Sequence, residues 1–403
     1  MFIGLNETVR GASHIDSGTV CQDYSAYKTT DDYAVAAVAD GHGSKKHFRS
    51  DVGSKAAVEV GLQAIEEFCK DINEFEKKFK ESPEYIITKI QKYIIKNWYD
   101  KVNEHYSQNE VREEERTQLT DDELSAIKIE SIYGTTFIMV VLTKNLCFGV
   151  QLGDGSLCII QQCGESYMPI IDDESCPANL TASMCNSNAI KMFNYFYDYN
   201  KPLSMIVSTD GLFTSFSSQE SFEEYNCLLT SQLDDVELLK TRIKKNFVRR
   251  TNSGSRDDIS IAIIFEKEMF DENFINVQMQ VDINKNKAAI REAEEKAKQL
   301  QRRARAEQIR YEKAMLEEAQ KRMLAEKQKR RQEMESLMTE EEVVQLAAAE
   351  AEAEAETVAE AEAEAESEAY EYYNDESQID MAEAEAEAEE LLHQLEEKSM
   401  NLS

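Results

Sequence analysis

The chain has 403 residues and a formal net charge of −33. This charge argues against non-specific binding to nucleic acid or to an anionic membrane surface, because both are polyanions and would repel it. Residues up to about 270 have the apolar content of a folded domain, whereas Ala, Glu, Lys, Arg and Gln dominate the remainder. Length alone therefore overstates the part that can build a hydrophobic core.

The N-terminus has no basic start, and no uninterrupted apolar run in the chain is long enough to span a bilayer. The eight cysteines form no Cys-x-x-Cys pair, and several lie in apolar runs. They are typical of small buried side chains in a reducing compartment. We therefore expect a soluble, cytoplasmic protein.

The first loop, residues 11–24, is rich in Gly, Ser, Asp and Thr, which predicts a connection between two strands. It contains His14 and Asp23. An isolated histidine such as His14 is more typical of a structural hydrogen bond than of a ligand. Asp23 directly precedes a β-prone segment, so we expect it to meet Asp40 across a sheet.

Residues 34–43 read Ala-Val-Ala-Ala-Val-Ala-Asp-Gly-His-Gly, an apolar run of strand length that ends in a carboxylate, an imidazole and two glycines. Glycine permits a sharp turn and leaves its carbonyl group open to a ligand. Asp40, Gly41 and His42 are therefore placed for metal or acid–base chemistry at the mouth of a buried strand. The other interpretation is an ordinary polar turn after a strand, and this stretch alone does not separate the two.

Apolar residues recur at helical spacing over residues 55–70, 84–104 and 222–247, which predicts helices. The stretch 105–130 is polar and acidic, and we expect a loop or a solvated helix end without chemistry there. Further strands are predicted at residues 133–142, 146–152, 157–160, 203–209 and 259–265. The irregular segment 163–200 is a candidate flap over a site.

Aspartates recur beside these later strands. Asp154 lies in a Gly-Asp-Gly segment between two strands, where hairpin turn chemistry alone would explain it. Asp210 follows the strand at 203–209, and Asp257 precedes the strand at 259–265. Carboxylates gathered on one scaffold would repel one another without cations. Oxygen ligands alone favour Mg²⁺ or Mn²⁺ over zinc, which usually recruits the Cys and His ligands that do not cluster here.

The order and wording of these segments resemble the PP2C-like, metal-dependent serine/threonine protein phosphatases of the bacterial-type branch. The matching pieces are Ser-His at 13–14, Cys-Gln-Asp at 21–23, Asp-Gly-His-Gly at 40–43, Tyr-Gly-Thr-Thr at 133–136, Gly-Asp-Gly at 153–155, Ser-Thr-Asp-Gly at 208–211 and Arg-Asp-Asp-Ile-Ser at 256–260. Each piece is a weak signal, whereas the ordered set is specific. The resemblance implies an α+β fold, a four-layer α/β/β/α sandwich of two antiparallel sheets with the metal site at one end.

The resemblance also implies a ligand set for two Mn²⁺ or Mg²⁺ ions. Asp40 would bridge the two ions, with the carbonyl of Gly41 as a further ligand, and Asp210 and Asp257 would complete the pair. Asp154 together with Asp210 would hold a weaker third ion. A water that bridges the two ions would attack phosphoserine or phosphothreonine in proteins, with no covalent phosphoenzyme.

Three further roles follow from the same resemblance. Asp23 would act on the metals through water, and His42 would be the general acid that protonates the leaving oxygen, a role suited to an imidazole with a pKa near 6.5. The arginine with which many eukaryotic members grip phosphate is missing from the first loop. His14 and Arg10 are the candidates for that contact.

Residues 153–156 read Gly-Asp-Gly-Ser where many members have Gly-Asp-Ser-Arg, which keeps the carboxylate. Because every expected metal ligand is kept, an active enzyme is favoured over a catalytically silent, phosphatase-like scaffold that acts through its helical tail. Hydrolysis of small phosphorylated metabolites is a third interpretation that the sequence leaves open.

The last part of the chain divides further. Residues 271–338 predict a long charged helix, in which 285–338 could self-associate as a coiled coil or stay a solitary helix. Residues 339–403 are Ala-Glu repeats with 23 acidic residues and one lysine. They favour a disordered, solubilising tail over an interaction segment that engages the basic helix. The expected division is a phosphatase-like domain at 1–270, the helix at 271–338 and the acidic tail at 339–403.

Overall fold

The computed structural model describes residues 1–116, 119–170 and 181–336, together with a few isolated positions between 339 and 349. Its core is two five-stranded sheets in which every strand pair is antiparallel. The first sheet has the order β1 (Phe2–Val9), β10 (Ile259–Glu266), β9 (Ser204–Ser208), β6 (Ser156–Ile160) and β7 (Ser166–Tyr167). The second has the order β2 (Tyr24–Thr29), β3 (Tyr33–Ala39), β4 (Phe137–Thr143), β5 (Cys147–Leu152) and β8 (Asn194–Asp198).

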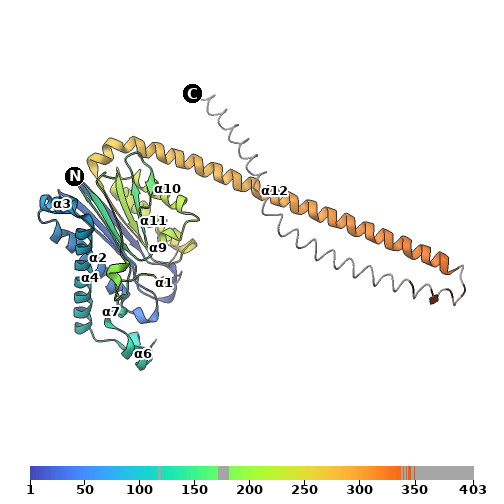
Figure 1. The fold of residues 1–403 in the computed structure, drawn as a ribbon, viewed down its shortest axis with the longest axis horizontal. Coiled ribbons are helices and arrows are strands. Elements are labelled where there is room, and N and C mark those ends of the chain that lie inside the picture. The colour runs from blue at the N-terminus through green and yellow to red at the C-terminus, as the bar shows by residue number, and fades with distance from the viewer. Residues whose placement is uncertain are drawn as a thin grey trace. The chain divides into compact units, whose positions relative to one another are not determined.

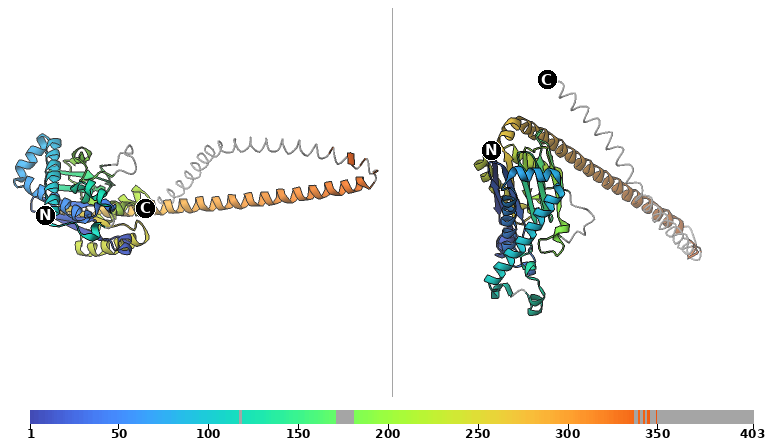
Figure 2. Two further views of the ribbon diagram at one scale, coloured as in Figure 1. Left: turned by 90° about the horizontal axis from the view of Figure 1, so that it is seen from below. Right: turned by 60° about the vertical axis from the view of Figure 1, so that its left-hand side comes forward.

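Helices cover the outer faces of both sheets (Figures 1 and 2). The second sheet is covered by α2 (Ser50–Phe68), α3 (Ile72–Glu81) and α4 (Pro83–Gln108). The first is covered by α10 (Gln219–Thr230), α11 (Val236–Ser253) and the start of α12 (Lys267–Glu335). The expected four-layer sandwich of two antiparallel sheets is therefore confirmed.

Three apolar clusters fill the spaces between these layers. Trp98 of α4 is buried over the second sheet, and Phe247 of α11 is buried over the first. Val38, Val140 and Val207 belong to the cluster between the two sheets. Strands β3, β4 and β10 are almost wholly buried because both of their faces are covered, so they read as continuous apolar runs in the sequence.

Short helices fill the connections: α1 (Ala12–Ser17), the 3₁₀ turn η1 (Lys45–His47), α5 (Glu113–Arg116), α6 (Asp121–Ala126), α7 (Ile129–Ile132), α8 (Ala189–Met192) and α9 (Asp210–Phe213). The first loop was expected to connect two strands, and within it lies the short helix α1, which ends at Gly18 in the left-handed conformation with φ 77°. The helical pattern at 222–247 is two helices, because the Asp235 side chain accepts a hydrogen bond from Leu238 N and starts a new helix.

The acidic stretch at 105–130 carries a buried ion pair that sequence reasoning did not anticipate. The Arg49 side chain is buried and donates to both carboxylate oxygens of Glu115, at 3.0 and 2.9 Å. It also donates to the hydroxyl of Tyr133 and to the carbonyl oxygens of Asn109 and Glu110. One guanidinium thus ties this stretch to the body of the domain.

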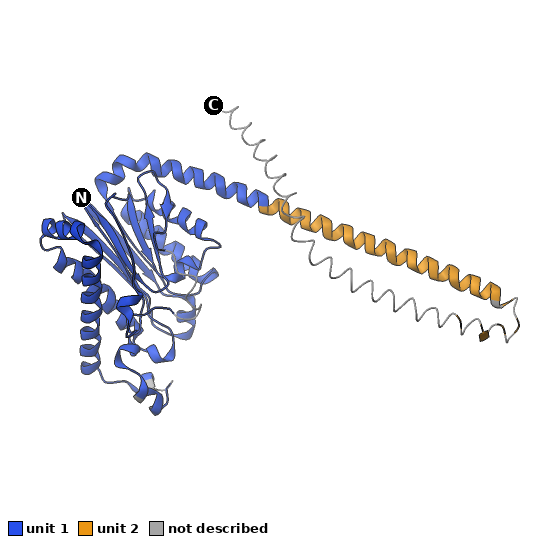
Figure 3. Cartoon of the chain, viewed as in Figure 1, with its two compact units in different colours: residues 1–294 blue, residues 295–403 orange. Residues whose placement is uncertain are grey.

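Helix α12 belongs to two compact units, residues 1–294 and 295–403 (Figure 3). Its first turns bury Phe270, Val277 and Val281 against the first sheet. The sequence composition changes near residue 270, but the helix stays packed on the first unit up to at least Val281. Among the described residues, no helix is both long enough and apolar enough to cross a membrane. Nearly all of the predicted acidic tail at 339–403 lies outside the described residues.

Candidate active site

Strand register brings the sequence-predicted aspartates to one end of the sandwich. Tyr24 pairs with Ala39, so Asp23 before β2 and Asp40 after β3 are neighbours. Asp154 lies between β5 and β6, and Ser156 and Ser208 pair across the first sheet. Asp210 follows β9, and Ser208 also pairs with Ile261 of β10, the strand that begins two residues after Asp257. These strand ends therefore form one edge of the site.

A cavity of about 690 Å³ opens at this end. The residues lining it are Ser13, His14, Gln22, Asp40, Gly41, His42, Gly43, Ser44, Lys46, His47, Thr181, Ser183, Cys185, Asn186, Ser255, Arg256 and Asp257. They include five of the sequence-predicted site residues. Part of the predicted flap at 163–200 also lines the cavity, through residues 181–186. Gly41 is required by close approach, because a Cβ there would lie 2.7 Å from the carbonyl oxygens of Gln22 and Ser50.

The carboxylates act on one another electrostatically. Burial and the neighbouring carboxylates of Asp23 and Asp210 raise the pKa of Asp40 well above its usual range. Burial, together with Asp154 and Asp257, raises the pKa of Asp210 to about 6, although its hydrogen bond with Asp40 works the other way. Ionising all of these neighbouring acids at once is therefore unfavourable in the metal-free protein, because their negative charges repel one another.

Asp23 is buried, and its Oδ2 accepts a hydrogen bond of 2.7 Å from Thr209 Oγ1. Burial and the nearby Asp258 raise the pKa of Asp23 strongly. Asp154 is exposed and accepts a bond of 2.8 Å from Thr181 Oγ1, which attaches the segment after residue 180 to the carboxylate edge. Both aspartates therefore flank the Asp40 and Asp210 pair.

His42 lies on the cavity wall with its backbone N–H donating to Gly134 O at 3.1 Å. Its ring packs on that of His47, with centroids 5.0 Å apart. Burial, then the nearby His47 and Lys46, lowers the pKa of His42 to about 4. This pKa lies well below the ordinary value near 6.5 on which the expected role of His42 was based. The imidazole is therefore neutral at pH 7 in the free protein.

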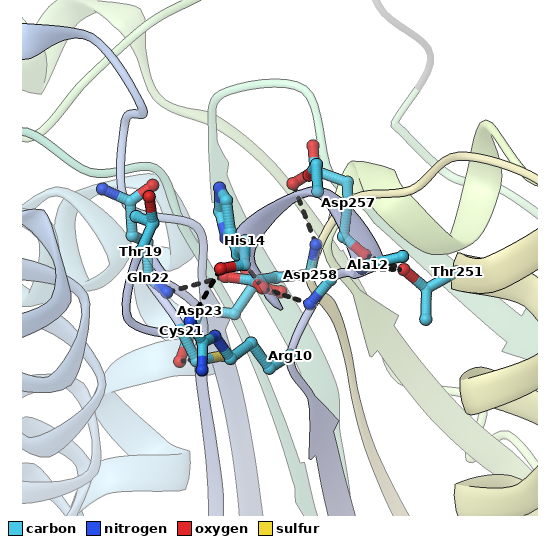
Figure 4. Close-up of polar contacts among 12 residues, drawn as sticks. Arg10, Ala12, His14, Thr19, Cys21, Gln22, Asp23, Thr251, Asp257 and Asp258 are labelled. Atoms are coloured by element: carbon cyan, nitrogen blue, oxygen red, sulfur yellow. Dashed lines mark hydrogen bonds and ion pairs between the residues drawn. The ribbon is translucent and has the colours of Figure 1, made fainter. Parts of the chain in front are cut away.

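The first loop is held by a residue that the sequence reasoning did not single out, Asp258 (Figure 4). Its buried carboxylate accepts from the backbone N–H groups of Gly11 and Gln22, each at 2.6 Å. Nδ1 of His14 lies 2.9 Å from Asp258 Oδ1. Arg10 donates to the carbonyl of His14 at 2.6 Å and does not line the cavity. His14 and Arg10 thus both make contacts that shape α1.

We expect Asp258→Ala to unfold the first loop locally and to lower the stability of the whole domain. The change leaves two buried N–H groups without an acceptor, at about 1–3 kcal/mol each. Urea unfolding measures the total, and amide hydrogen exchange at residues 11 and 22 locates it. An Asp258→Asn variant keeps an acceptor oxygen and is expected to lose less. Equal losses for the two variants would contradict this anchoring role.

Two cations on the cavity wall were also missed, Lys46 and Arg256. Arg256 has φ 64°, the left-handed region that a non-glycine residue adopts only when its surroundings hold it there. Its carbonyl accepts from the N–H and the hydroxyl of Ser13, at 2.9 and 2.7 Å, and its guanidinium contacts Asp16. A sequence signal did exist, because Arg256 directly precedes one of the predicted metal ligands.

The donor set fits hard divalent cations. Oδ1 of Asp210 is buried without a hydrogen-bond partner among the described residues. Within that same part of the chain, no three His, Cys, Asp or Glu side chains form a group that could hold an ion by themselves. Mg²⁺ usually keeps several waters and needs only one or two carboxylates, so this spacing is compatible with it. The residues therefore fit an ion held by carboxylates, a carbonyl and water.

Comparison with known proteins agrees with this geometry. The profile of the Protein phosphatase 2C family matches residues 10–247. This chain therefore belongs to the Protein phosphatase 2C family. No curated protein matches the sequence.

Solved structures include similar folds of low sequence identity. The S. agalactiae serine/threonine phosphatase is 16% identical with a TM-score of 0.42, over 66% of this chain and 100% of that chain. The Mycobacterium tuberculosis serine/threonine phosphatase PstP/Ppp is 11% identical with a TM-score of 0.40, over 66% and 98%. RsbX in complex with magnesium is 14% identical with a TM-score of 0.37, over 66% and 94%.

Proposed function

We propose that this protein hydrolyses phosphoserine and phosphothreonine in proteins with the help of two divalent metal ions. The proposal is supported by the groups that line one cavity. The carboxylates of Asp40 and Asp257 lie there with the imidazole of His42 and the cations of Lys46 and Arg256. Such a site pairs a place for metal ions with groups that attract a phosphate dianion.

Asp40, Gly41, Asp210 and Asp257 would hold the two Mn²⁺ or Mg²⁺ ions, and Asp154 would contribute to a third. When bound, the ions would lower the pKa of a water between them and supply the nucleophile. Bound cations would lower the raised pKa values of Asp40 and Asp210, because a nearby positive charge favours the carboxylate form. Asp23 would orient water from behind them.

His42 would donate the proton that the leaving serine or threonine oxygen needs. A bound phosphate dianion would raise the pKa of this imidazole, which burial holds at about 4 in the free protein. The role assigned to His42 therefore depends on substrate being present.

The test is initial-rate hydrolysis of a phosphothreonine peptide with Mn²⁺, with Mg²⁺ and with EDTA. We expect turnover with one or both metals and none in EDTA. Folded protein without turnover in either metal would contradict the proposal and favour a silent, phosphatase-like scaffold. Equal or faster hydrolysis of small phosphorylated metabolites would move the substrate class away from proteins.

Lys46 and Arg256 are proposed to attract the substrate phosphate in place of His14 and Arg10. Arg256→Gly removes the guanidinium and keeps a residue suited to the left-handed backbone. We expect Lys46→Ala and Arg256→Gly each to lower kcat/KM by roughly tenfold, mainly through KM, because each removes a charged contact to phosphate. Peptide kinetics at saturating metal measure this.

The matched control is Lys45→Ala, because Lys45 contacts Glu123 at 3.2 Å and does not line the cavity. It should leave kcat/KM within about twofold of the wild-type value, as expected for an exposed ion pair. A loss for Lys45→Ala as large as that for Lys46→Ala would argue against phosphate contact.

A cytoplasmic location and self-association through residues 285–338 stay predictions.

A further inference from the structure

A second cavity, of about 560 Å³, adjoins the candidate active site. It lies between α4, the residues at the start of α7 and the segment that leads into α8. Cys185 and Asn186 line both this cavity and the first one. We call it the lysine groove, and its shared wall places it next to the site where a phosphorylated side chain would react.

The lysine groove takes its name from Lys92, Lys96 and Lys128. Lys92 and Lys96 are one helical turn apart on α4, and Lys128 is the residue before α7. All three are exposed, and none forms a salt bridge with a described residue. Their positive charges are therefore open to a ligand.

Two carboxylates also line the lysine groove, Asp100 and Glu130. Glu130 lies 3.4 Å from the amide nitrogen of Asn103, which donates to it. The three lysines leave an excess of positive charge in a chain whose net charge is −33. Ile95 and Ile190 add apolar surface to the lining. The combination suits a peptide better than a small anion.

The wall between the two cavities is fixed to the second sheet. Ser183 N donates to Asn186 Oδ1 at 2.6 Å, and Met184 N donates to Thr135 O at 2.9 Å. Thr135 is in turn bound to the Asp40 carbonyl, at 2.7 Å through its hydroxyl. A ligand that crosses this wall would therefore lie close to the strand end that carries Asp40.

We propose that the lysine groove binds acidic residues that flank the phosphorylated serine or threonine of a protein substrate. The inference rests on the proposed function and adds to it a substrate class, phosphoproteins with Asp or Glu near the reacting residue. Charge complementarity and the position next to the candidate active site both point to this occupant.

The experiment uses the full chain and two matched phosphothreonine peptides, one with flanking Glu residues and one with Gln in their place. We expect the wild type to show roughly a tenfold higher kcat/KM for the Glu peptide, because three exposed charge pairs each add a small factor. The triple variant Lys92→Gln, Lys96→Gln, Lys128→Gln should bring this ratio close to one. Added salt should lower the wild-type ratio.

The control is Lys77→Gln with Lys80→Gln, two exposed lysines of α3 that do not line the lysine groove. This control should keep the wild-type ratio. A wild-type ratio near one, or an unchanged ratio in the triple variant, would overturn the substrate class while leaving the phosphatase proposal standing.

A binding measurement separates the two proposals if neither peptide is hydrolysed. Fluorescence anisotropy of a labelled, unphosphorylated Glu peptide should show weaker binding to the triple variant than to the wild type by roughly tenfold. No difference would overturn the groove assignment independently of activity. Tighter binding of a single-stranded oligonucleotide than of the Glu peptide at the same sites would also overturn it.

Discussion

Asp40→Asn is expected to abolish phosphatase activity, by roughly two to three orders of magnitude in kcat, and to stabilise the metal-free protein. The loss would follow because the carboxylate proposed to lie between two cations is replaced by a neutral amide, on the scale of removing one preorganised electrostatic group. The gain follows because burial and neighbouring acids raise the pKa of Asp40. A carboxyl group whose pKa is higher in the folded state lowers stability at pH values above its unfolded pKa, and the amide removes that cost.

The measurement is Tm in EDTA and with Mn²⁺, alongside peptide turnover. Wild-type Tm should rise with Mn²⁺ because only the folded state holds the ion tightly, whereas the variant should start higher in EDTA and rise less. The matched control is Asp32→Asn, which changes a carboxylate that pairs with Lys144 before β3, at the other end of the strand. A variant less stable than wild type in EDTA would contradict the crowded-carboxylate account.

Arg49→Ala is expected to lower the free energy of unfolding by about 3–5 kcal/mol, the largest stability loss predicted for one polar side chain here. Removing one partner of a buried ion pair is costly because the other stays buried without its main counter-charge. The carbonyl oxygens of Asn109 and Glu110 would lose the Arg49 donor, and Glu115 would keep only its contacts with Arg112. Urea unfolding gives the value, and a loss of structure confined to residues 105–130 would appear in hydrogen exchange.

Arg112→Ala is the control, because Arg112 donates to the same Glu115 from a side chain that is 70% exposed. It should cost less than about 1 kcal/mol. A loss for Arg49→Ala no larger than that would contradict the stabilising role of the buried Arg49–Glu115 pair.

Acid should weaken the Arg49–Glu115 ion pair over a defined range of pH. Burial works to raise the pKa of Glu115, but hydrogen bonds from Arg49 and Arg112 outweigh it and lower the pKa from 4.5 to about 2. A carboxylate whose pKa is lower in the folded state stabilises the protein above pH 4.5, and this contribution is lost as pH falls towards 2. Glu115→Gln should therefore show a flatter fall in stability over that range.

The fold was predictable because its strands carry a strong signal. The apolar runs of β3, β4 and β10 are continuous since both faces are buried, and Asp-Gly pairs follow β3, β5 and β9. Residue order along the chain then fixes which end each aspartate occupies once the strands pair as antiparallel neighbours. The carboxylate edge of the site was therefore within reach of sequence reasoning.

The contacts that hold the site were not predictable in the same way. Asp258 adjoins Asp257 in the sequence, yet its partners Gly11 and Gln22 are more than two hundred residues away. Glu115, the buried partner of Arg49, lies in a stretch whose composition is that of a solvated loop. Burial, which lowers the pKa of His42, likewise depends on tertiary packing that local sequence does not encode.

The most direct test of the two-metal proposal is the rate of phosphothreonine peptide hydrolysis as a function of Mn²⁺ concentration, in wild type and in Asp210→Asn. The proposal predicts metal-dependent turnover in the wild type and a loss of at least about a hundredfold in the variant at every Mn²⁺ concentration. Asp32→Asn should behave as wild type. Turnover that persists in EDTA, or an Asp210→Asn variant as active as wild type, would contradict the account.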